Sequence, residues 1–288
     1  MSLPIKKIYV DSKHKLSTSA SNSDFKVELK ESYLMPEGAV FKICDVCIPH
    51  SWTTIMTGIN DKFYFYVSNT NPISTRPQTG YIATLDAENL SGTEFATKLA
   101  SAMNTAYGSS VFSVAYNVLK QSITISTSVS NMTFKIMTEN DIKTKLDGDW
   151  PNGLDNTPTD YDANKPNDIN TNMLKLNSGN ALLNTHSVPF ESTFINLQPI
   201  RNLYLTSPTL GNYNTVDLRG DRTILKKIPV TAGFNQMIFD NIAYDDYLDC
   251  SRQLIQTMNF RLQDGLGNIV PLGGTYISFS IIFDVLVK

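Results

Sequence analysis

Residues 276–287 read YISFSIIFDVLV, and this stretch decides the fold class of the chain. Apolar side chains occupy every second position from Ile277 to Val287. Polar side chains fall on the other face, with Ile282 and Leu286 as exceptions. Because side chains alternate between the two faces of a strand, the pattern predicts a long β-strand with one face buried in a core.

A second alternating run at residues 254–263 precedes this strand, and the cluster DGLGN at 264–268 separates the two. Asp, Asn and Gly are the residues that tight turns favour. We therefore predict that the chain closes with an antiparallel hairpin. Such a hairpin is typical of β-sandwiches and jelly rolls.

Further strands are predicted on both sides of the middle of the chain. Phe25, Val27 and Leu29 alternate with charged residues, which indicates a half-buried strand. A nearly continuous apolar strand covers residues 39–48, and Pro49 ends its pairing because proline has no N–H group. β patterning resumes at residues 194–197, 203–205, 223–230 and 237–239.

One helix interrupts the β pattern. Apolar residues recur at helical spacing between Phe95 and Ala106, and Ser91 with Glu94 has the spacing of a capping box. Gly108 is well placed to end this helix. Short strands are predicted after it, at residues 111–116, 122–127 and 131–137.

The composition changes at residues 138–184, where Asp, Asn, Thr, Pro and Gly accumulate. A loop of this length is uncommon inside a compact domain, so we interpret it as the surface of an inserted domain. The sequence thus predicts a discontinuous β domain over residues 1–60 and 186–288. The predicted insertion covers residues 61–185.

The bulk composition is that of a globular protein, with 288 residues, of which 41% are hydrophobic and 18% charged. The formal net charge is −3 and basic residues are scattered, which argues against a nucleic-acid partner. The first residues do not resemble a signal peptide, and no apolar run is long enough to span a membrane. Three cysteines without a signal peptide indicate a reducing compartment.

Cys44 and Cys47 have the C-x-x-C spacing of redox and zinc sites. In a regular strand their side chains face opposite ways and their Cα atoms lie about 10 Å apart, beyond disulfide reach. His50 is a conceivable third zinc ligand, but the sequence offers no fourth. We interpret both residues as ordinary strand cysteines.

No motif predicts catalysis, a cofactor or a metal. His14, His50 and His186 share no metal-ligand spacing, and no Ser or Cys lies in a nucleophile-elbow context. Residues 244–249, YDDYLD, gather carboxylates without the spacing of a calcium loop, so a solvated turn is the interpretation. We expect that the protein is not an enzyme.

Arg219, Gly220 and Asp221 form a tripeptide that integrins recognise. Gly and Asp are also ordinary turn residues, so chance and a cell-attachment site both stay open. The tripeptide precedes the strand predicted at 223–230 and is expected to be exposed.

The segment that follows, DRTILKKIPV at 221–230, resembles a segment of the penton (minor capsid) proteins of virophages and Polinton-like viruses. Other segments resemble that family in the same order: IYVDS at 8–12 with SDF at 23–25, CDVCIP at 44–49 and MNFRLQDG at 258–265. The unit at 93–116 is similar to an insert found in related viral proteins. Residues 147–172 have no counterpart in the family pattern.

The resemblance implies a single jelly-roll β-sandwich with an inserted α+β or β domain. It also implies a homopentamer that occupies capsid vertices, contacts the double-jelly-roll major capsid protein, and assembles in the host cytoplasm or a viral factory. Two alternatives stay open. One is a β-sandwich attachment protein whose inserted domain contacts a receptor or glycan, and the other is an enzyme on a jelly-roll scaffold.

Overall fold

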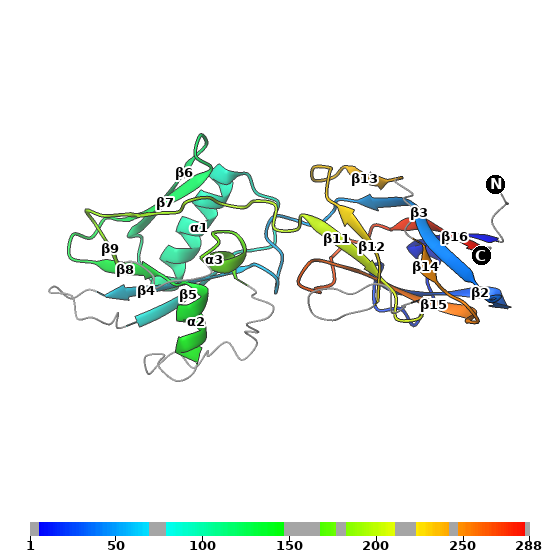
Figure 1. The fold of residues 1–288 in the computed structure, drawn as a ribbon. Helices are drawn as coiled ribbons and strands as arrows, with labels where there is room; N and C mark the ends of the chain where they lie inside the picture. The colour runs from blue at the N-terminus through cyan, green and yellow to red at the C-terminus, as the bar shows by residue number, and fades with distance from the viewer. Residues whose placement is uncertain are drawn as a thin grey trace. The chain divides into compact units, whose positions relative to one another are not determined.

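The computed structural model describes residues 6–68, 79–146, 168–176, 183–210, 223–241 and 247–285. The chain divides into two compact units (Figure 1). The first contains Met1–Trp52 and Ile200–Lys288, and the second contains Thr53–Pro199. The protein is mainly β, and within the described residues its helices lie in the second unit apart from one 3-10 turn, η1 (Ser12–His14).

The first unit is a sandwich of two antiparallel sheets. One sheet has the order β1-β16-β3-β13, with β14 also beside β3, and the other has the order β12-β11-β15-β2. The chain changes sheet at most of its connections, which gives the strand order of a single jelly roll. The strands are β1 (Lys6–Asp11), β2 (Asp24–Leu34), β3 (Ala39–Pro49), β11 (Asn202–Thr206), β12 (Ile224–Pro229), β13 (Met237–Asp240), β14 (Leu248–Asp249), β15 (Leu254–Gln263) and β16 (Ser278–Val285).

The predicted closing hairpin is wrong. β15 pairs with β11 and β2, whereas β16 pairs with β1 and β3 in the other sheet. The turn itself forms, because the Asp264 carboxylate accepts backbone N–H groups of Leu266 and Asn268 at 2.8 Å each. Pairing of the returning chain with β15 ends near Pro271, which has no N–H to donate, and the chain then crosses to the second sheet.

The buried faces of β15 and β16 meet across the sandwich instead of along one sheet. The Phe260 ring of β15 lies 5.0 Å from the Phe279 ring of β16 in an edge-to-face arrangement. Phe260 also lies 5.6 Å from Phe25 of β2. The alternation therefore identified Phe260 and Phe279 as buried, and their contact joins the two sheets. It was wrong at Leu254, which is 67% exposed beyond an irregularity in the pairing of β15 with β2.

The second unit contains two further antiparallel sheets, β5-β4-β8-β9 and β10-β7-β6. Its helix α1 (Gly92–Tyr107) has the predicted capping box of Ser91 and Glu94, and it ends at Gly108 with φ 83°. The other elements are β4 (Lys62–Ser68), β5 (Thr79–Thr84), β6 (Phe112–Asn117), β7 (Ser122–Thr127), β8 (Thr133–Ile136), α2 (Glu139–Leu146), α3 (Ile169–Asn172), β9 (Leu183–Thr185) and β10 (Phe190–Glu191).

The segments 53–60 and 186–199, which the sequence assigned to the β domain, belong to the second compact unit. Ile55 and Ile195 are buried in the core of that unit. The strand expected at 194–197 does not form, because the Ile195 and Asn196 N–H groups donate to two different segments, at Gln121 and Met173. The division into a jelly-roll domain at 1–60 and 186–288 and an insertion domain at 61–185 stays a prediction.

Polar side chains of α3 fix the middle of the β4 strand. The Asn170 side chain accepts the Tyr64 N–H at 3.0 Å and donates to the Tyr64 carbonyl at 2.8 Å. Asp168 caps α3 by accepting the Thr171 N–H at 2.6 Å. Burial raises the pKa of the Asp168 carboxyl from 3.8 to about 6.

We predict that Asp168→Asn stabilises the second unit at neutral pH. The raised pKa means that the folded state favours protonated Asp168, so this carboxyl costs stability as the pH rises through 6. Asn keeps a capping oxygen and carries no charge. Thermal unfolding should show the variant up to about 3 kcal/mol more stable than wild type at pH 7.5, with the gap closing near pH 4. A gap that is the same at both pH values would contradict the prediction.

Candidate interaction surface

The strand that carries both cysteines of the C-x-x-C spacing contains a β-bulge. Asp45 has φ 52°, and Cys44 and Cys47 stand opposite Ser280 and Ser278 of β16, which are only two residues apart. The extra residue brings both cysteines to the outer face of the sheet, so the expectation of opposite faces is wrong. Both thiols are free.

Apolar side chains are exposed where this sheet ends at β13. Phe239 lies opposite Cys47, and Met237 lies opposite Pro49. The exposed fractions are 63% for Phe239 and 42% for Met237, and Phe234 in the preceding loop is 43% exposed. We call these five residues, Phe234, Met237, Phe239, Cys47 and Pro49, the apolar edge.

His50 positions the loop that leads into β13. Its N–H donates to the Gln236 carbonyl at 2.8 Å, and its carbonyl accepts the Asn235 N–H at 2.7 Å. The Nδ1 atom lies 2.8 Å from the Ala232 carbonyl, to which it donates, and the ring stacks on Trp52 at 4.1 Å. His50 thus holds the apolar edge in place and is not available as a zinc ligand through Nδ1.

The register shows which backbone groups of β13 face outward. The bond from His50 to Gln236 makes these two residues a hydrogen-bonded pair, and such pairs alternate along an antiparallel ladder. The N–H and C=O groups of Met237 and Phe239 therefore point away from β3. Within the described ranges, no other strand pairs with β13. An exposed, apolar sheet edge of this kind is a template for association.

The other candidate residues are dispersed. The His186 Nδ1 donates to the Thr127 carbonyl at 2.7 Å, and exposed His14 ends the η1 turn. The Asp249 carboxylate accepts the Ser251 N–H at 2.9 Å, which is turn chemistry. In the described part of the chain, no group of three or more His, Cys, Asp and Glu side chains is placed to hold a metal ion.

Two candidate segments lie outside the described residues. These are the tripeptide Arg219, Gly220 and Asp221 and the first half of the carboxylate cluster, residues 244–246. Of the helices in the described ranges, none has the length and apolarity that crossing a membrane requires.

The sequence did not reveal the apolar edge. Residues 237–239 were predicted as a strand, but Met237, Ile238 and Phe239 are apolar on both faces, so alternation cannot tell which side is exposed. The one pattern that the sequence offered was a strand apolar on both faces. A strand that is buried on both faces has the same pattern, so the sequence does not distinguish the two cases.

Comparison with known proteins shows a similarity of structure but none of sequence. No family model matches the chain, and no curated protein matches its sequence. Among solved structures, the chain is similar to a crystal structure of the mavirus penton protein, with a TM-score of 0.49 and 9% sequence identity. The similarity covers 98% of this chain and 100% of that chain.

We predict that a thiol reagent distinguishes the three cysteines of the native protein. Cys47 is half-buried on the apolar edge, whereas Cys44 and Cys250 are buried. Burial raises the pKa of the Cys47 thiol, and it raises the pKa of Cys250 to about 12. Because the thiolate is the reactive form, mass spectrometry should find modification at Cys47 first, faster as the pH rises. Equal modification of all three before unfolding would contradict this.

Proposed function

We propose that this protein is a structural virion protein: a homopentameric penton that occupies icosahedral capsid vertices and contacts the double-jelly-roll major capsid protein. In this proposal the chain has no catalytic role and no direct nucleic-acid partner. Its location is the capsid vertex, after assembly in the host cytoplasm or a viral factory.

The apolar edge is the observation that carries the proposal. It joins exposed apolar side chains to outward-facing backbone groups at the end of a jelly-roll sheet. Contact between this edge and a different surface of the next copy is a heterologous interface, and such an interface closes into a ring when its rotation divides the circle.

The fold and the sequence add support. Viral capsid proteins are one of the groups that use double-sheet jelly rolls, although lectins and cupins share the architecture, so the fold alone does not decide the function. The sequence resemblance to penton proteins covers segments in both halves of the jelly roll, at 8–25, 44–49, 221–230 and 258–265. Vertex proteins work through geometry and lateral contacts, which agrees with a candidate site made of apolar side chains.

We predict that replacing Met237 and Phe239 together by Ser weakens ring formation. Both side chains point outward from β13, so the jelly-roll core should be unaffected. In the proposed ring, both side chains are buried between neighbouring subunits. Losing them should raise the protein concentration at which half of the chains are assembled by at least about tenfold. Light scattering and negative-stain electron microscopy of the full chain measure this, with five-fold rings expected for the wild type.

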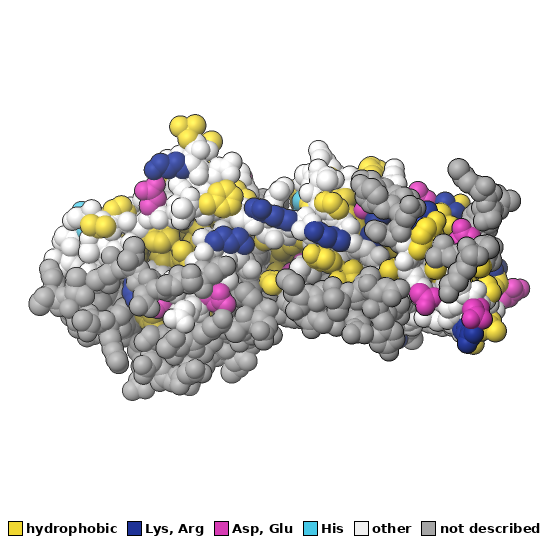
Figure 2. Space-filling model, viewed as in Figure 1, with side chains coloured by type: hydrophobic (Ala, Val, Ile, Leu, Met, Phe, Trp, Pro, Cys, Tyr) yellow, Lys and Arg dark blue, Asp and Glu magenta, His cyan; other side chains and the backbone are white. Residues whose placement is uncertain are grey.

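A matched control removes exposed apolar side chains elsewhere. Apolar side chains gather at the tip of the β6–β7 hairpin in Figure 2, where Leu119 is 96% exposed and Val118 is also exposed. The double replacement of Val118 and Leu119 by Ser should assemble like the wild type. A wild-type chain that stays monomeric at all concentrations, both alone and with the major capsid protein, would overturn the proposed function.

A further inference from the structure

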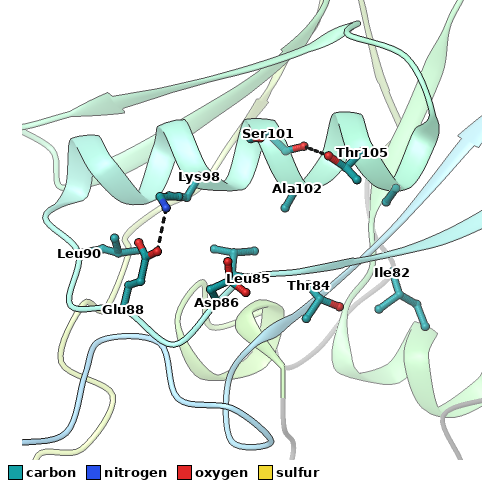
Figure 3. A pocket seen from close by; sticks show the side chains of 11 residues that line it. Ile82, Thr84, Leu85, Asp86, Glu88, Leu90, Lys98, Ser101, Ala102 and Thr105 are labelled. Atoms are coloured by element: carbon teal, nitrogen blue, oxygen red, sulfur yellow. Dashed lines mark hydrogen bonds and ion pairs between the residues drawn. The ribbon is translucent and has the colours of Figure 1, made fainter.

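A groove runs between helix α1 and the edge strand β5 of the second unit (Figure 3). Its volume is about 440 Å³, within the range of ligand pockets. The strand contributes Ile82 and Thr84, and the helix contributes small or polar side chains that leave room beside the strand. The helix residues are Lys98, Ser101, Ala102, Thr105 and Ala106.

β5 is the last strand of its sheet and pairs only with β4 within the described residues. Ile82 lies opposite Tyr64, whose N–H and C=O are both bonded on the other side of β4 by the Asn170 side chain. The Ile82–Tyr64 pair is therefore a non-hydrogen-bonded pair of the ladder. The N–H and C=O of Ile82 consequently point away from β4, toward the open edge.

The next residues confirm this phase. The Leu85 N–H donates to the Asp61 carbonyl at 2.9 Å, so Leu85 faces β4 and Thr84 faces the open edge. Ile82 and Thr84, which alternate along β5, thus each present a backbone N–H donor and a C=O acceptor at the open edge. Both residues also line the groove.

The end of the groove beyond Thr84 is acidic. Glu88 pairs with Lys98 at 2.8 Å, whereas Asp86 has no cation within ion-pair distance in the described part of the chain. Figure 3 shows Glu88 and Lys98 facing each other, with Asp86 beside Leu85. One ammonium group against two carboxylates leaves a negative excess that favours a basic side chain.

We propose that this groove binds an extended peptide of a partner protein by β-strand addition to β5. The peptide runs antiparallel to β5, bonds to the main chain of Ile82 and Thr84, and places a Lys or Arg near its N-terminal end against Asp86 and Glu88. Main-chain bonds supply affinity in this mode of recognition, and side chains between the strand and a neighbouring helix supply specificity. This inference does not depend on the proposed penton function.

The test starts from a displayed library of random eight-residue peptides, selected on the full-length protein. The enriched peptides should alternate in polarity and carry a basic residue near the N-terminus. For the best of them, Thr84→Pro should weaken binding at least about tenfold, because proline removes the donor. Proline is tolerated at an edge whose N–H faces solvent. Thr84→Ala keeps the N–H and should bind within about twofold of wild type.

Further variants guard against a folding defect. Ser101→Phe fills the groove from an exposed position of α1 and should also abolish binding, whereas Asp86→Lys should weaken only the peptides that carry a basic residue. Amide hydrogen exchange should show protection of Ile82 and Thr84 when the peptide is bound. All these variants should assemble like wild type, which separates a failure here from a failure of the proposed function.

Three results would overturn the inference. One is a library that enriches no peptide on the wild-type chain. Another is binding that Thr84→Pro and Ser101→Phe leave unchanged. The third is a different occupant: either a glycan that protects the Ile82 and Thr84 amides, or pairing of β5 with β5 of a second copy, seen as a dimer that Thr84→Pro abolishes.

Discussion

The contact between Phe260 and Phe279 is the constraint on which the first unit depends. It joins the inner face of β15 to the inner face of β16, and these strands belong to opposite sheets. Because β16 lies between β1 and β3, residues from both ends of the chain form one sheet. The sandwich can therefore close only after the last strand is made, and the second unit must leave and return between β3 and β11.

Alternation in the sequence identified faces but not neighbours. It predicted strands at residues 254–263 and 276–287, of which 286 and 287 lie outside the described residues, because burial requires apolar side chains at every second position. It identified the buried residues of the two strands except at Leu254, which is exposed. The same pattern is compatible with a partner in the same sheet or across the core, so the expected hairpin was wrong. Local signals did better: the capping box at Ser91 and the stop at Gly108 depend on residues adjacent in sequence.

Features that depend on residues far apart in the chain could not be predicted from the sequence. The bulge at Asp45 changes the face of every residue after it, and nothing in C-D-V-C indicates an extra residue. Phe239 is exposed on the outer face of β13, and in the described residues β13 pairs only with β3, which follows from the strand order of the whole unit. The open edge of β5 likewise depends on Asn170, a residue far along the chain that fixes the hydrogen-bonding phase of β4.

The two open edges differ in a way that bears on their partners. Unpaired edge strands invite uncontrolled association, and proteins limit this by shortening, charging or covering them. β13 is short and surrounded by apolar side chains, a combination that favours a tight contact with a surface of complementary shape. β5 lies beside α1 and ends near carboxylates. A whole second sheet that approached this edge would collide with the helix and would lie close to the negative charge. A single extended strand with a basic residue satisfies the backbone groups of Ile82 and Thr84 without either conflict.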